Sequence, residues 1–216
     1  MHKTTVSVLS IVALAFISLA SASRLRADTI FTNLGPGDSY QTNHQWNVGT
    51  GSGENQAVAF SFVPTETATL TDVSLGLYQI SGTSPTNVYI ESNLSGEPGS
   101  ILDTLTQVGS VTPTSSLVDF TCSSCSQLQA GTTYWIVGQQ SDSSSLAGWN
   151  LSNSDIGTWY YNFAGSATGP WTATDNPISA FEVDGTSPVP EPSTVVLLST
   201  GILGLAGTAR RKFFLR

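Results

Sequence analysis

The sequence predicts an all-β fold, an antiparallel β-sandwich or jelly roll. Short runs of β-branched and aromatic residues recur along the middle of the chain, with Gly, Pro, Ser and Asn between them, which is the pattern of strands joined by turns. No stretch there has a convincing helical period. The chain is 39% hydrophobic with 5 Trp, 6 Tyr and 9 Phe, so it has the apolar content for a packed core despite its low charge.

The strands follow from local composition. Ala57–Val63 is a dense apolar run that ends at Pro64, and Leu70–Ile80 alternates apolar and polar residues, as expected when one face of a strand is buried. The other predicted strands are Thr29–Thr32, Asn87–Glu91, Ile101–Val108, Leu117–Thr121, Tyr134–Gln140, Gly148–Leu151, Trp159–Phe163 and Ile178–Val183.

The charges are unevenly distributed. All 7 Lys and Arg lie outside residues 27–209, whereas all 15 Asp and Glu lie between Asp28 and Glu191. An acidic surface without cations repels phosphate backbones, so nucleic acid is excluded as a partner. The same segment has no Lys or Arg to hold a phosphate or stabilise an oxyanion.

The N-terminus has the plan of a secretory signal peptide. Lys3 precedes the apolar stretch Val6–Ala20, and Ala20-Ser21-Ala22 supplies small residues at a cleavage site. The sequence therefore predicts a signal helix in residues 1–22, with cleavage after Ala27 as the alternative.

A second apolar segment lies near the C-terminus. Residues 193–209 are uncharged, and Arg210, Arg211 and Lys212 follow directly within the basic tail 210–216. As a transmembrane-type helix the segment spans about 25 Å, slightly less than a ~30 Å hydrocarbon core. Because basic flanks stay in the cytoplasm, the two apolar segments together predict export of everything between them.

The end of the chain closely resembles the PEP-CTERM sorting signal of Gram-negative bacteria. The resemblance rests on Val189, Pro190, Glu191 and Pro192, the apolar segment and the basic cluster, together residues 189–212. It implies a transient inner-membrane anchor, cleavage near the Pro-Glu-Pro by an exosortase-type protease, and release to the cell surface or the extracellular medium. The alternative is an ordinary C-terminal anchor that is never cut.

Residues 28–184 are the predicted exported domain, and 185–189 are a linker to the sorting signal. The domain resembles the choice-of-anchor R family of exported bacterial domains, which carries no assigned enzymatic activity. The resemblance rests on Asn33–Tyr40, Ala57–Phe60, Asn87–Ile90 with Gly96–Gly99, and Ala130–Trp135. It transfers no catalytic residue to this chain.

Cys122 and Cys125 are the only cysteines. In an oxidising compartment we expect them to form a local structural disulfide that closes a tight turn. A redox role usually requires a helix N-terminus to lower the first thiol's pKa. A zinc site needs two further N or S ligands, and His44 is the only other candidate in the domain.

Aromatic residues crowd the last third of the domain. Trp149, Trp159, Tyr160 and Trp171 are the candidate glycan-binding residues, since exposed Trp and Tyr faces can stack on sugars. Core packing is the alternative for each of them. If Trp159–Tyr161 is extended, neighbouring side chains point to opposite faces of the sheet.

The sequence marks no catalytic residue and implies no cofactor. Calcium stays an alternative at Asn153–Asp155 or at Asp175–Asn176, without EF-hand spacing. A catalytic triad built on His44 is not indicated, because the sequence has no G-x-S-x-G nucleophile motif.

These patterns predict a non-enzymatic surface or extracellular-matrix protein, structural or adhesive among exopolysaccharides. A carbohydrate-binding module is the alternative. A glycoside hydrolase, which would require two carboxylates in one cleft, is a third hypothesis.

Overall fold

The computed structural model of the chain describes residues 27–51 and 54–187. These residues form twelve β-strands and no helix, which confirms the all-β prediction. The predicted signal helix (1–22), the sorting signal (189–212) and its basic cluster lie outside the described residues. Within the described part, no helix is long and apolar enough to cross a membrane.

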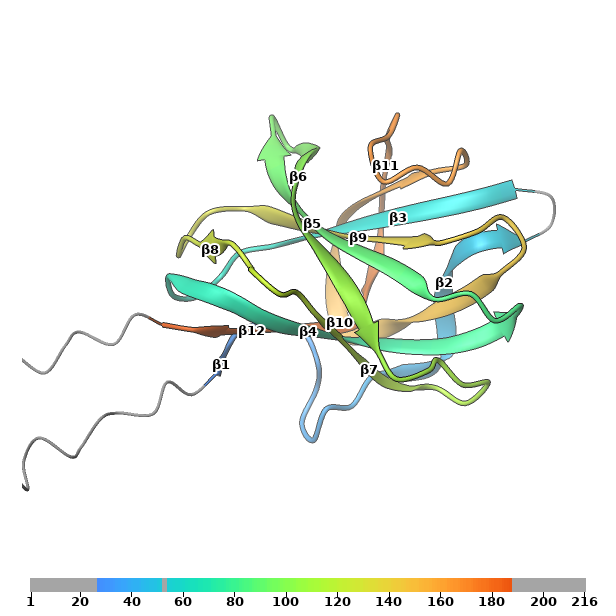
Figure 1. The fold of residues 1–216 in the computed structure, drawn as a ribbon, viewed down its shortest axis with the longest axis horizontal. Helices are drawn as coiled ribbons and strands as arrows, with labels where there is room; N and C mark the ends of the chain where they lie inside the picture. The colour runs from blue at the N-terminus through green and yellow to red at the C-terminus, as the bar shows by residue number, and fades with distance from the viewer. Residues whose placement is uncertain (1–26, 52–53, 188–216) are drawn as a thin grey trace, which may run out of the picture. The chain divides into compact units, whose positions relative to one another are not determined.

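The strands in chain order are β1 (Asp28–Thr32), β2 (Gln41–Gly51), β3 (Glu54–Phe62), β4 (Ala68–Ser81), β5 (Thr86–Leu94), β6 (Glu97–Val108), β7 (Ser116–Thr121), β8 (Gln127–Leu128), β9 (Tyr134–Gln140), β10 (Leu146–Asn162), β11 (Thr172–Ser179) and β12 (Phe181–Thr186). Figure 1 labels them along the ribbon. β9 has the predicted bounds, and most other predicted strands lie inside a longer observed one.

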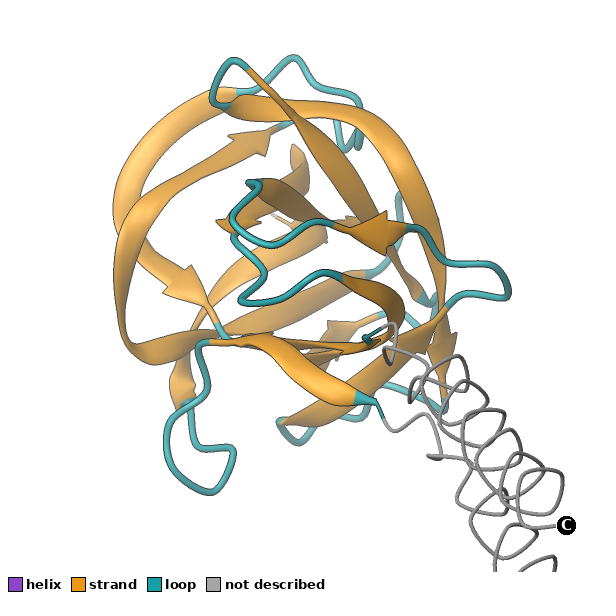
Figure 2. Ribbon diagram, turned by 90° about the vertical axis from the view of Figure 1, so that its left-hand side faces the viewer, coloured by secondary structure: helices purple, strands orange, loops and turns teal. Residues whose placement is uncertain are grey.

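One continuous sheet contains all twelve strands, in the order β1-β12-β4-β7-β6-β5-β9-β3-β2-β10-β11, with β8 beside β4. Because β10 also pairs with β4, the path from β4 through β7, β6, β5, β9, β3, β2 and β10 returns to its start. Figure 2 shows the strands curving around a common interior. The antiparallel pairing is confirmed in the strand ladders, but the two separate sheets of a sandwich are not.

The interior is filled by apolar side chains that alternate along the strands. Val58, Phe60 and Phe62 of β3 enter the main core, whereas Ala59 belongs to a smaller cluster. Trp149 of β10 is fully buried, with its ring centroid 4.9 Å from that of Phe60 in an edge-to-face contact. This period of two is what a strand requires when each of its faces packs differently.

Two observed elements differ from the sequence-based prediction. β2 was not predicted, because Trp46 and Val48 are its only large apolar residues. The run Gly148–Leu151 and residues 159–162 of the run Trp159–Phe163 belong to one seventeen-residue strand, β10, which ends just before Phe163. Conversely, the predicted strand Ile178–Val183 is divided at Ala180, between β11 and β12.

The division at Ala180 is a buried junction with satisfied backbone groups. The Asn33 side chain donates to the Ser179 carbonyl (2.8 Å) and accepts from the Phe181 N–H (2.8 Å). The Ala180 N–H donates to the Asn150 carbonyl, 2.8 Å away. The Ala180 carbonyl accepts from the Trp149 indole (2.9 Å) and from the Gly76 N–H (3.1 Å). Buried backbone groups must be hydrogen-bonded. These bonds therefore allow the chain to pass at Ala180 from pairing with β10 to pairing with β4.

Replacing Asn33 by Ala tests this junction. Asn33→Ala leaves the Ser179 carbonyl and the Phe181 N–H buried without their partners, and we expect about 2–4 kcal/mol of lost stability in urea unfolding. The control is Asn47→Ala, which removes an exposed amide that makes no hydrogen bond with the described residues and should change stability by less than about 0.5 kcal/mol. Equal effects of the two variants would contradict the role of Asn33.

Candidate functional site

An aromatic row runs along one face of β10 and continues one residue past its end, from the core to solvent. Trp159, Tyr161 and Phe163 are spaced by two residues, and their ring centroids are separated by 5.4 Å and then 5.0 Å. Trp159 is 2% exposed, Tyr161 is half-buried and Phe163 is 50% exposed. Phe163 therefore extends the buried rings to the protein surface, where its apolar ring contacts water.

Trp46 of β2 packs against the deep end of this row. Its ring centroid lies 4.4 Å from that of Trp159, and its indole donates to the Pro177 carbonyl of β11 at 2.9 Å. The hollow beside these rings has a volume of about 420 Å³. We call it the aromatic groove. Its lining residues are Gln45, Trp46, Asn47, Gln56, Trp159, Tyr161, Phe163, Thr174 and Asn176.

The path of β10 places these residues together. The first part of β10 pairs with β2, where Trp149 lies opposite Trp46. Its later part pairs with β3 on one side and β11 on the other, so that Trp159 lies between Phe60 and Thr174. One long strand therefore gathers lining residues from β2, β3 and β11.

The chemistry of the groove is aromatic and uncharged. Rings form its apolar part, and four amides with the hydroxyls of Thr174 and Tyr161 supply its polar part. The Trp159 indole N–H is buried without a hydrogen-bond partner, although buried indoles usually have one. A concave aromatic surface with a few polar groups is typical of a site for a small molecule or a sugar.

The predicted glycan-binding residues do not gather in this groove. Trp159 lines it, but Trp149 is fully buried in the main core. Tyr160 faces the other side of the sheet in a second cluster with Ala59, Trp135, Val137 and Ala167, against which Trp171 packs. Trp46, Tyr161 and Phe163 were missed as site residues. The alternation of Trp159, Tyr161 and Phe163 was a usable signal, whereas Trp46 lay in an unpredicted strand.

The structure has a second hollow, of about 500 Å³, between the β4–β5 and β6–β7 connections. Its lining has no aromatic ring and consists of small and polar residues with prolines and one valine. Neither hollow is lined by Asp or Glu among the described residues. The aromatic groove is therefore the better candidate for recognising a ligand.

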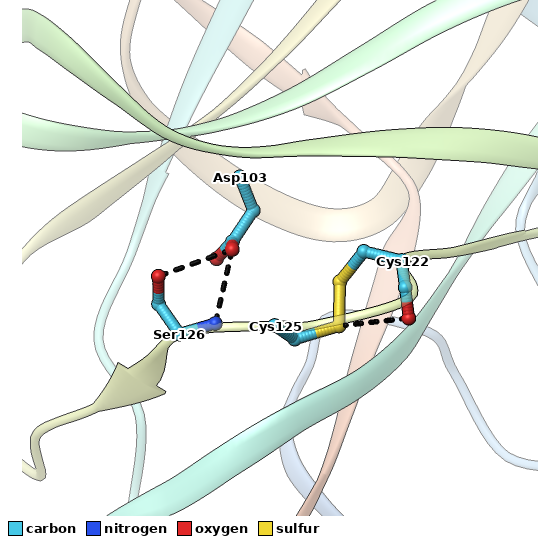
Figure 3. Close-up of a disulfide and its surroundings, with 4 residues drawn as sticks. All are labelled: Asp103, Cys122, Cys125 and Ser126. Atoms are coloured by element: carbon cyan, nitrogen blue, oxygen red, sulfur yellow. Dashed lines mark hydrogen bonds between the residues drawn. A yellow bond between two sulfur atoms is a disulfide. The ribbon is translucent and has the colours of Figure 1, made fainter.

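The Cys122–Cys125 disulfide is present, with the two Cα atoms 5.5 Å apart. Both cysteines are partly buried against the main core. Ser126 follows, and its N–H and hydroxyl donate to the buried Asp103 carboxylate at 2.9 and 3.0 Å. Figure 3 shows this arrangement. The disulfide and the Ser126–Asp103 hydrogen bonds hold the loop between β7 and β8 in place. This agrees with the predicted structural disulfide.

The remaining sequence candidates concern metal binding. Within residues 27–51 and 54–187, no group of three or more His, Cys, Asp or Glu side chains could hold a metal ion. His44 is exposed. Asp175 accepts a hydrogen bond from the Thr158 hydroxyl at 2.7 Å. Calcium binding at Asn153–Asp155 or at Asp175–Asn176 stays a prediction.

Glu91 of β5 is a buried carboxyl group outside the groove. It lies opposite Ile101 of β6 and Trp135 of β9, it is 0% exposed, and neither carboxylate oxygen has a hydrogen-bond partner. Burial raises the pKa of Glu91 to about 7, because the charged form loses its hydration. Glu91 therefore keeps its proton where an ordinary glutamate has lost it.

This pKa shift predicts stability that falls as pH rises. Below pH ~4.3 Glu91 is protonated in both states; between ~4.3 and 7 the unfolded chain binds fewer protons than the folded one. The free energy of unfolding should therefore fall by up to about 1.4 kcal/mol per pH unit in this window and level off above it. Glu91→Gln should remove this part of the slope in urea unfolding at pH 4.5–8. An unchanged slope would contradict the assignment to Glu91.

Comparison with known proteins identifies the tail. The family model of the PEP-CTERM protein-sorting motif matches residues 188–212, which confirms the predicted sorting signal. The motif implies processing by an exosortase-type protease. It also implies a membrane-anchored stage followed by sorting to the surface.

This motif indicates an exosortase-sorted, exported surface protein. No curated protein and no solved structure matches the chain. The match covers the tail alone, so the choice-of-anchor R resemblance of residues 28–184 stays a prediction.

Proposed function

We propose that the exported domain is a non-enzymatic adhesive module, which attaches the cell surface or the extracellular matrix to polysaccharide through the aromatic groove. The single observation that carries this proposal is the row of Trp159, Tyr161 and Phe163 beside Trp46, open to solvent at Phe163. Rings exposed in this way stack on the apolar faces of sugars, and neighbouring amides hydrogen-bond the hydroxyls.

The lining of the groove supports adhesion over hydrolysis. A glycoside hydrolase uses two carboxyl groups that flank the scissile bond. The groove is instead lined by aromatic rings, amides and a threonine. The alternative is a purely structural surface domain. It predicts no glycan binding, so a binding measurement distinguishes the two.

Tyr161 and Phe163 are the residues that test adhesion, because neither is fully buried. We expect Phe163→Ala and Tyr161→Ala to weaken binding to the host's extracellular polysaccharide about tenfold each, ~1.4 kcal/mol, in affinity electrophoresis or calorimetry. Leu94→Ala is the matched control, since Leu94 is 66% exposed and lies outside the groove. Absence of polysaccharide binding by the unsubstituted protein would contradict the adhesive function and favour the structural one.

Processing of the tail has a separate test. The intact mass of the protein recovered from its host should show an end near Pro190–Pro192. Replacing both prolines by Ala should preserve the full-length chain, because it removes two residues of fixed φ that hold Glu191 in an extended segment. Pro188→Ala is the matched control, a proline outside the triplet. Full-length protein as the stable product in the inner membrane would show an uncut anchor.

A further inference from the structure

The amides around the aromatic groove are not engaged within the protein. Gln45 and Asn47 alternate along β2, and Gln56 lies on the adjacent β3 opposite Gly49. Their side chains make no hydrogen bond with the described residues, whereas the Asn176 amide donates to the Thr174 hydroxyl at 3.0 Å. Each free amide offers two donors and a carbonyl acceptor, so three hydrogen-bonding groups surround the rings without serving the fold.

The Trp159 indole at the deep end of the groove also has an unmet hydrogen bond. Its N–H is buried without a partner, whereas the indoles of Trp46, Trp135 and Trp149 each donate at 2.9 Å. A buried donor left without an acceptor destabilises the folded state, because it has lost its bond to water and gained none in return. This is a second and independent sign that the groove is not optimised for the fold alone.

The groove and its surroundings are unsuited to a charged ligand. No lining side chain carries a charge, and no Lys or Arg lies between residues 27 and 209 to pair with a carboxylate or sulfate. The Asp and Glu of the domain add a negative field that repels anionic chains. A cationic sugar would have no carboxylate in the groove to replace its hydration.

We propose that the aromatic groove selects an uncharged polysaccharide, and that Gln45, Asn47 and Gln56 determine which one by hydrogen-bonding its hydroxyl groups. This inference rests on the proposed adhesive function and adds the chemical class of the ligand and the residues that confer specificity. Trp46, Trp159, Tyr161 and Phe163 supply stacking area, which is tolerant of sugar identity. The three amides supply directional contacts, which depend on hydroxyl configuration.

The test is calorimetry of the purified protein with a panel of defined oligosaccharides. The uncharged probes are malto-, cello-, laminari- and manno-oligosaccharides; the charged probes are a uronic-acid oligomer and a glucosamine oligomer. We expect binding of at least one uncharged series, with little dependence on salt, and much weaker binding of both charged probes. Asn47→Ala, Gln45→Ala and Gln56→Ala should each weaken the preferred series about three- to tenfold.

Asn43→Ala is the matched control for the amide variants. Asn43 lies on β2, is exposed, and is not part of the groove lining, so its loss should leave affinity unchanged. Urea unfolding of each variant shows whether the fold is intact. The ratio of affinities between two uncharged series should also change in the amide variants, which loss of stability alone would not produce.

The outcomes separate this inference from the function on which it rests. Tighter binding of either charged probe, or amide variants that bind like Asn43→Ala, would overturn the inference while leaving adhesion through the aromatic rings intact. Failure of every oligosaccharide and of the host polysaccharide to bind would overturn the proposed function itself.

Discussion

The structure depends on one buried junction, where β11 ends at Ser179 and β12 begins at Phe181. The Asn33 side chain bonds to both residues, and the Ala180 carbonyl accepts from the Trp149 indole and from Gly76. This arrangement lets the chain leave the edge beside β10 and cross to β4 without burying an unpaired backbone group. It also fixes Trp149 in the interior. β10 then continues beside β3 and carries Trp159 and Tyr161 to the aromatic groove, with Phe163 directly after its end.

The sequence revealed those parts of the fold whose burial pattern is local. Leu70–Ile80 and Tyr134–Gln140 alternate or are densely apolar, and each lies within an observed strand. β2 was not predicted because its own composition lacks a strand pattern. It forms a strand through its pairing with β10 and β3. Ile178–Val183 was predicted as one strand because its hydrophobic residues indicate only that it is buried. They do not indicate that the chain passes from β10 to β4 at Ala180. Closure of the sheet arises from pairings between strands distant in sequence, which periodicity does not encode.

The candidate site was also predictable only where its residues follow a local sequence pattern. Trp159 was identified as a candidate, and the alternation of Trp159 with Tyr160 was correctly expected to divide them between two faces. Aromatic content alone could not separate Trp149, which stabilises the core, from Phe163, which contacts solvent. The amides of the groove were not predictable, because Gln45 of β2 and Gln56 of β3 line the same groove only once the strands have paired. The sorting motif, by contrast, is contiguous in sequence and was identified directly.

The absence of Lys and Arg between residues 27 and 209 constrains both the folding and the function of the exported domain. Among residues 27–51 and 54–187 its carboxylates have no Lys or Arg to pair with, and uncharged donors bind several of them instead. Asp119 accepts from the Ser74 hydroxyl at 2.7 Å, Asp175 from Thr158, and Asp103 from Ser126. Glu91 has no such donor and instead retains its proton, its pKa raised by burial. Hydroxyl and amide donors and aromatic packing therefore stand where other domains use ion pairs. The same uncharged chemistry lines the aromatic groove and favours a ligand without charge.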